Sequence, residues 1–196
     1  MLRYLALAIL ALTFAATAAD DLSRTKTIKM DLYTVSAPAT KGWVTKKDKR
    51  SKTINIAKTD RASKIGLWID IIPQEVTGMY ATVHTQKWLG DDLVRREHAN
   101  MVALGVIPGL YTLEDVTKYE TDIGGKHGYA MRYRKDVLGE FTEHGYLFVY
   151  FPPDFEERGV IYKFLRTSTG EGSASSEPDY TVFDFVIDSF RSRSAR

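Results

Sequence analysis

The residues of this sequence that could do chemistry are scattered and form no recognisable catalytic set. The four histidines, His84, His98, His127 and His144, match no short metal-ligand spacing such as H-E-x-x-H. The segment Gly170-Glu171-Gly172-Ser173 lacks the following glycine of a nucleophile elbow. Neither a phosphate-binding loop nor a dinucleotide fingerprint occurs. The sequence therefore predicts no catalytic residue, no metal ligand and no cofactor.

Positive charge is concentrated in the stretch 41–52, which holds six basic residues and one aspartate. Such a loop could bind an acidic partner or lipid headgroups, or it could be a hairpin tip that discourages pairing between strand edges. One tryptophan lies beside this expected loop and another lies just before the expected central helix. Exposed aromatic side chains there would mark an interface, whereas buried ones would be core residues. The candidate contact residues are therefore Lys46, Lys47, Lys49, Arg50, Trp43 and Trp88.

Two histidines lie on neighbouring expected strands, so their register decides whether they could share a metal. With a turn centred near residues 138 and 139, paired positions sum to about 277, because antiparallel partners lie opposite each other. His144 then faces Tyr133 and lies away from His127, which does not favour a shared metal. The same register places Glu143 opposite Arg134 as a surface ion pair.

The N-terminus has the pattern of an export signal. One basic residue, Arg3, precedes an uncharged run rich in Leu and Ala, and Ala16-Thr17-Ala18 offers small residues at the cleavage positions. We expect a signal peptide over 1–18 with cleavage after Ala18, a flexible segment over 19–29, and one domain over 30–192. No second long apolar run follows, so no integral membrane span is expected after cleavage. The net charge of +2 does not favour nucleic acid as a partner.

Hydrophobic periodicity predicts mostly antiparallel strands with a helix in the middle and a helix at the end. Several strands are apolar on both faces and so need cover on both. The predicted class is α+β, with helices on both faces of a mainly antiparallel sheet. The expected strands cover 31–35, 43–44, 53–58, 64–72 (ended by Pro73), 114–121, 129–134, 146–151 and 160–165, with helices over 91–104 and 176–190 and a mobile loop over 167–176.

The order of these elements resembles the PsbP-like family. A short strand ends near Pro38, and Trp43, a hairpin, a helix and a meander turned at Gly124-Gly125 follow before the closing helix. The most specific piece is Phe-Asp-x-x-x-x-Ser-Phe over 183–190. The resemblance covers about 30–192 and implies an α/β/α sandwich, which the family shares with the Ran-binding Mog protein. Family members include photosystem accessory proteins of the thylakoid lumen and bacterial exported proteins. They are typically non-enzymatic, so no catalytic residues carry over.

Three functional hypotheses remain open. The first is an exported, periplasmic or secreted, non-enzymatic accessory or binding domain that contacts an envelope protein or a ligand. The second is a hydrolase whose site is assembled from distant segments, which one sequence does not reveal because such triads are defined by geometry. The third is a peripheral protein that binds a membrane surface through the basic loop 41–52. The sequence leaves the oligomeric state open.

Overall fold

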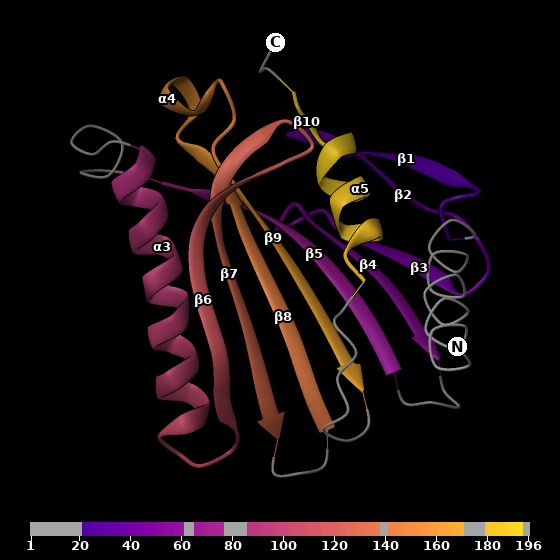
Figure 1. The fold of residues 1–196 in the computed structure, drawn as a ribbon. Helices are drawn as coiled ribbons and strands as arrows, with labels where there is room; N and C mark the ends of the chain where they lie inside the picture. Colours follow the sequence, from indigo (N-terminus) through magenta and orange to yellow (C-terminus); the bar gives the residue numbers. More distant parts are fainter. Residues whose placement is uncertain (1–20, 61–64, 77–85, 138–140, 171–178, 194–196) are drawn as a thin grey trace, which may run out of the picture.

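The computed structural model describes residues 21–60, 65–76, 86–137, 141–170 and 179–193, so the expected signal peptide 1–18 lies outside it. Its main feature is a seven-stranded antiparallel sheet in the order β3-β4-β5-β9-β8-β7-β6 (Figure 1). The prediction of a mostly antiparallel sheet is confirmed. The strands are β3 (Trp43–Asp48), β4 (Thr53–Asp60), β5 (Ile65–Glu75), β6 (Thr112–Ile123), β7 (Lys126–Val137), β8 (Phe141–Tyr150) and β9 (Val160–Gly170).

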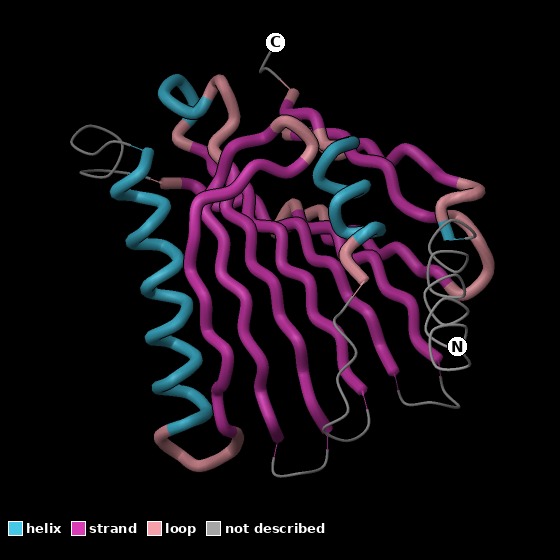
Figure 2. Tube along the Cα trace, viewed as in Figure 1, coloured by secondary structure: helices cyan, strands magenta, loops and turns pink. Residues whose placement is uncertain are grey.

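A smaller sheet and the helices complete the described part (Figure 2). The small sheet has the order β1-β2-β10, with β1 (Thr25–Lys29), β2 (Tyr33–Pro38) and β10 (Arg191–Ser192). The helical elements are α3 (Gln86–Met101), the π-helical turn η1 (Val102–Val106), the single turn α4 (Phe155–Arg158) and α5 (Thr181–Ser189). Among the described residues, no helix has the length and apolar character needed to cross a membrane.

The buried residues form two hydrophobic cores that share β8. Phe148 belongs to the core that contains α5, whereas its neighbours Leu147 and Val149 belong to the core that contains α3. Successive side chains of a strand point to opposite faces of the sheet, so α5 and α3 pack with different sets of sheet residues. We call the face that carries Phe148 the α5 face.

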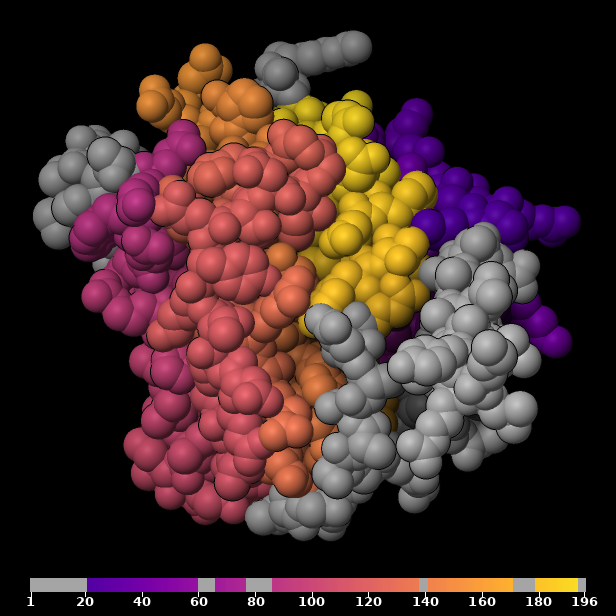
Figure 3. Space-filling model, in the orientation of Figure 1, coloured from indigo at the N-terminus to yellow at the C-terminus, as the bar shows by residue number. Residues whose placement is uncertain are grey.

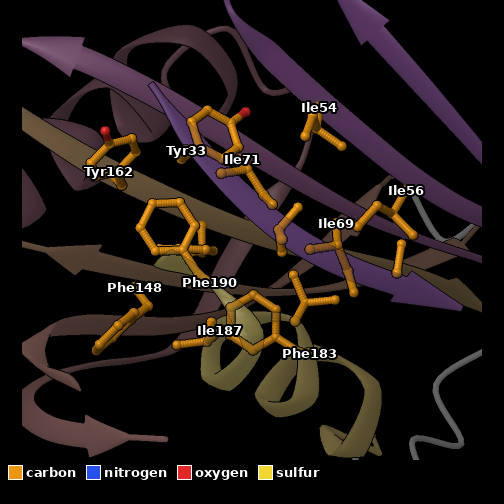
Figure 4. Packing of buried hydrophobic residues seen from close by; sticks show 14 of the residues in the cluster. Tyr33, Ile54, Ile56, Ile69, Ile71, Phe148, Tyr162, Phe183, Ile187 and Phe190 are labelled. Carbon is orange, nitrogen blue, oxygen red and sulfur yellow. The ribbon is translucent and has the colours of Figure 1, made fainter. Parts of the chain in front are cut away.

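The closing helix α5 lies within the predicted range 176–190 but begins only at Thr181, and it forms there because its apolar residues repeat at helical spacing. Val182, Phe183, Val186 and Ile187 are all buried, and Figure 4 shows Phe183 and Ile187 packed with the isoleucines of β4 and β5. In the space-filling view, α5 (yellow) fills the region between β6 and the β1–β2 ribbon (Figure 3). Immediately after the helix, Phe190 is fully buried. The serine expected to begin the helix, Ser176, lies outside the described residues.

Most strands are longer than the sequence predicts, and two of them continue through residues that were expected to end them. Pro73, expected to end its strand, lies inside β5 opposite Tyr162 of β9. The pairing between β5 and β4 ends at Ile71. Beyond Ile71, β5 is therefore an edge strand on the side of β4, and an edge strand tolerates a proline, which has no N–H group. A loop was expected to begin at Thr167. Instead β9 continues through Thr167, which pairs with both β5 and β8.

The other differences lie near the N-terminus and at the central helix. Residues 25–29, expected within a flexible segment, form β1 and pair with β2, and Ile28 is buried. The central helix begins at Gln86, five residues before the expected Asp91. Gly105 does not end the helical conformation, because 102–106 continue as η1. The absence of a side chain at Gly105 is needed here, since a Cβ would lie 1.7 Å from the ring of Tyr111.

Candidate binding site

The α5 face changes from apolar to polar within two residues along the central strands. Ala130, Phe148 and Phe164 are directly paired on β7, β8 and β9, and all three are buried in the core that contains α5. Two residues further along, the paired residues are Arg132, Tyr146 and Arg166. Residues directly opposite in an antiparallel pair share a face, so two arginines flank Tyr146 on the α5 face.

Tyrosine rings surround these two arginines. The Arg132 guanidinium carbon lies 4.6 Å from the centre of the Tyr180 ring, 4.9 Å from that of Tyr146 and 5.7 Å from that of Tyr119. The Arg166 guanidinium carbon lies 4.8 Å from the same Tyr180 ring. These distances are those of cation–π contacts. We call these five residues the arginine–tyrosine cluster.

Arg166 is the most buried cation of the cluster, with only 3% of its surface exposed. Its Nη1 donates to Ser168 Oγ at 3.1 Å and its Nη2 donates to the Asp179 carbonyl at 3.0 Å. Its Nε has no hydrogen-bond partner. Burial lowers the pKa of Arg166, but an arginine remains charged in proteins at ordinary pH. The cluster therefore holds a buried positive charge with an unused donor.

No carboxylate of the described residues forms an ion pair with Arg132 or Arg166. Arg134, two residues along β7, differs in that it pairs with Glu114 and lies 3.3 Å from a carboxylate oxygen of Asp115. Asp184 of α5 interacts with both cluster arginines only at longer range. Desolvation raises the pKa of Asp184, and Arg132 opposes that effect. A buried charge without a paired counter-charge is costly, which makes the cluster a candidate site for binding an anion.

The next paired row on the α5 face contains Arg134, His144 and Ser168. Burial lowers the pKa of His144, and the charges of Arg134 and Arg166 lower it further. No hydrogen bond joins His144 to Ser168, whose Oγ accepts from Arg166. Within the described ranges, none of the histidines lies within hydrogen-bond distance of both a serine and a carboxylate, which is the arrangement the hydrolase hypothesis needs.

The predicted register between β7 and β8 is wrong by one residue. Glu143 lies opposite Lys135, and the two side chains form an ion pair of 2.9 Å. His144 lies opposite Arg134. His127 lies opposite Asp122 of β6, so it does not meet His144. The paired positions sum to 278, and a shift of one residue changes every cross-strand partner.

The structure does not bring the predicted contact residues together. Lys46, Lys47, Lys49 and Arg50 are all exposed around the tip of the β3–β4 hairpin. Trp43 begins β3 at the other end of that strand and is only 8% exposed, with the Lys58 ammonium 5.8 Å from its ring centre. Trp43 is therefore too buried to present the exposed aromatic side chain that the predicted interface needs.

Trp88 is 40% exposed on α3, and α3 packs against β7 and β8. It lines a groove of about 360 Å³ together with Asp91, Arg95, Lys118 and Tyr129. Since β3 is one edge of the large sheet and β6 is the other, this groove is separate from the basic hairpin. The candidate residues thus belong to different surfaces.

Neither a known family model nor a curated protein matches the sequence. Among solved structures, the chain is similar to cyanobacterial PsbP (CyanoP) from Synechocystis sp. PCC 6803, with 18% identity over 87% of this chain and 92% of that chain and a TM-score of 0.53. The fold is PsbP-like. A weaker similarity is to LpqN of Mycobacterium tuberculosis, described as involved in cell envelope biogenesis, with 12% identity over 87% of this chain and 91% of that chain and a TM-score of 0.45. The predicted PsbP-like fold is confirmed.

Proposed function

We propose that this protein is an exported, non-enzymatic binding domain that contacts an acidic ligand or an acidic segment of an envelope protein through the arginine–tyrosine cluster. The single observation behind this proposal is the pair Arg132 and Arg166, which share the Tyr180 ring and lack a paired carboxylate among the described residues. An acidic group from outside the chain would supply the missing counter-charge.

The chemistry of the cluster suits binding better than proton transfer. Guanidinium groups stay protonated, and burial raises the pKa of Tyr146 above its ordinary value. Near neutral pH both kinds of side chain therefore keep their protons, whereas a general acid or base needs a pKa near the working pH. They can donate hydrogen bonds and orient a ligand.

The proposal also takes up two expectations from the sequence. Export rests on the signal-like residues 1–18, and the non-enzymatic role agrees with the resemblance to the PsbP-like family. We take the fold as an α/β/α sandwich, with α5 on one face of the sheet and α3 on the other. In that arrangement the cluster lies on the α5 face beside Tyr180, at the N-terminal end of α5.

Cross-linking in native envelopes tests the proposal. Tagged full-length protein should recover one partner in a stoichiometric amount, and Arg132→Gln combined with Arg166→Gln should abolish that recovery. Arg134→Gln is the matched control, because Arg134 lies on the same strand and face but already pairs with Glu114 and Asp115. Circular dichroism would confirm that each variant is folded. Equal recovery with all variants, or no partner with intact protein, would refute the role of the cluster.

The basic hairpin supports a second candidate function. Lys46, Lys47, Lys49 and Arg50 are exposed on the edge hairpin of the large sheet, a position from which they could reach anionic headgroups. Charge reversal at these four residues should abolish sedimentation with anionic liposomes. Binding that ignores the reversal would remove this candidate.

A further inference from the structure

We propose that the arginine–tyrosine cluster takes a phosphate-type dianion, either inorganic phosphate or the terminal group of a phosphate monoester. The inference rests on the proposed binding function and names the class of ligand. It starts from the charges at the site. Arg132 and Arg166 bring two positive charges onto one sheet face, and a phosphate monoester carries about −1.5 to −2 at neutral pH. One such group would neutralise both arginines.

The donors of the cluster also fit an oxyanion. Besides the unpaired Nε of Arg166, the Nε of Arg132 is buried without a hydrogen-bond partner. Both guanidinium carbons lie within 5 Å of the centre of one ring, that of Tyr180, so both charges lie beside the same aromatic side chain. Hydrogen bonds from guanidinium to phosphate are charge-assisted and often bidentate. A tetrahedral oxyanion can accept from two arginines at once, because it presents several oxygens.

The sheet and α5 hold these donors in fixed positions. Arg132 and Arg166 are held on either side of Tyr146 by the ladders of β7, β8 and β9. The Arg166 fork is fixed further by Ser168 and by the Asp179 carbonyl just before α5. Binding therefore requires little ordering of these side chains, which reduces its entropic cost.

A carboxylate is a poorer match than a phosphate. The chain has its own carboxylate nearby, Asp184, whose charge is felt by Arg132 and Arg166 but which pairs with neither. A monoanion would leave about one positive charge uncompensated. Charge matching therefore favours the dianion, and acetate provides the corresponding comparison ligand.

The test is a titration of the full-length protein with inorganic phosphate at constant ionic strength, followed by heteronuclear NMR shifts and by thermal unfolding. Wild type and Arg134→Gln should show saturable shifts and a rise in Tm. Arg132→Gln should weaken binding by at least roughly tenfold, since it removes a positive charge and its charge-assisted hydrogen bonds to the anion. Arg132 is only half-buried, so this variant keeps the test decisive if Arg166→Gln fails to fold.

Comparison ligands separate the outcomes. Phenyl phosphate should bind at the same residues as inorganic phosphate, and binding only to vesicles that contain phosphatidic acid would reassign the source of the phosphate to lipid. Acetate that binds as well as phosphate overturns the assignment to a dianion. An equal rise in Tm for all variants also overturns it, because phosphate then acts by exclusion from the protein surface. If phosphate fails but cross-linking still depends on Arg132, the proposed binding function stands and only the ligand class falls.

Discussion

Gly124, at the turn between β6 and β7, lies directly against Asp188 in the last turn of α5. A Cβ at Gly124 would fall 2.5 Å from the Asp188 Cα. Beside it, the Lys126 ammonium donates to the Asp188 carbonyl at 2.9 Å, a favourable place for a cation because a helix C-terminus is negative. The curled end of the β6–β7 hairpin thus holds the end of α5 on the sheet (Figure 1).

This contact predicts different effects for two adjacent glycines. Gly124 and Gly125 both have positive φ, +56° and +70°, so alanine at either position costs about 1–2 kcal/mol in backbone strain. Only at Gly124 does the new Cβ meet backbone, which adds about 1–3 kcal/mol of overpacking. Urea unfolding should therefore show a larger loss for Gly124→Ala than for Gly125→Ala. Equal losses would mean that the hairpin does not press on α5.

Phe190 is predicted to be one of the most sensitive core positions. Its ring centre lies 5.3 Å from that of Tyr33, 4.6 Å from that of Tyr162 and 5.1 Å from that of Phe164. It therefore joins the small sheet, the large sheet and the end of α5. Phe190→Ala should lower the free energy of unfolding by about 3–5 kcal/mol. Phe185→Ala, on the partly buried side of α5, is the control and should cost clearly less.

The fold was largely predictable from local patterns, as two elements illustrate. In β5, Ile69 and Ile71 lie two positions apart, on the same face of the strand, and are fully buried. In α5 the helical spacing of Val182 and Val186 marks the buried face. Positions that depend on pairing were harder to predict. Pro73 fits inside β5 because β4 ends beside it, and one sequence does not reveal where a neighbouring strand ends.

The candidate site could not be predicted because it needs two registers at once. Arg132 and Arg166 are 34 positions apart in the sequence, and both meet Tyr146 only through the β7–β8 and β8–β9 ladders. A register that is wrong by only one residue is enough to pair Glu143 with Arg134 and not with Lys135. The one local signal is that Arg166 follows Val160, Tyr162 and Phe164 at alternate positions, and this signal does not identify the residues beside it.

The connection after α3 predicts a contrast between exposed and buried apolar residues. Leu104 and Ile107 are 73% and 76% exposed, so Ile107→Ala should change the free energy of unfolding by no more than about 0.5 kcal/mol. Leu89 on α3 is 2% exposed, and Leu89→Ala should cost about 2–5 kcal/mol. Denaturant unfolding measures both. A large loss for Ile107→Ala would show that this turn is covered, for instance by a second molecule, which sedimentation would detect.

The free energy of unfolding should fall as the pH is lowered below about 6.5, the ordinary pKa of histidine. The reason is that burial lowers the pKa values of both His144 and His98 in the folded protein. Between the folded and unfolded pKa values the unfolded chain binds more protons than the folded one, so the free energy of unfolding decreases as pH falls through this window. Each histidine contributes a slope of at most about 1.4 kcal/mol per pH unit. His144→Gln should reduce the slope measured by urea unfolding between pH 7 and pH 5, and adding His98→Gln should reduce it further. A double variant with the wild-type slope would assign the effect to other groups, since carboxylates are the next to titrate below this range.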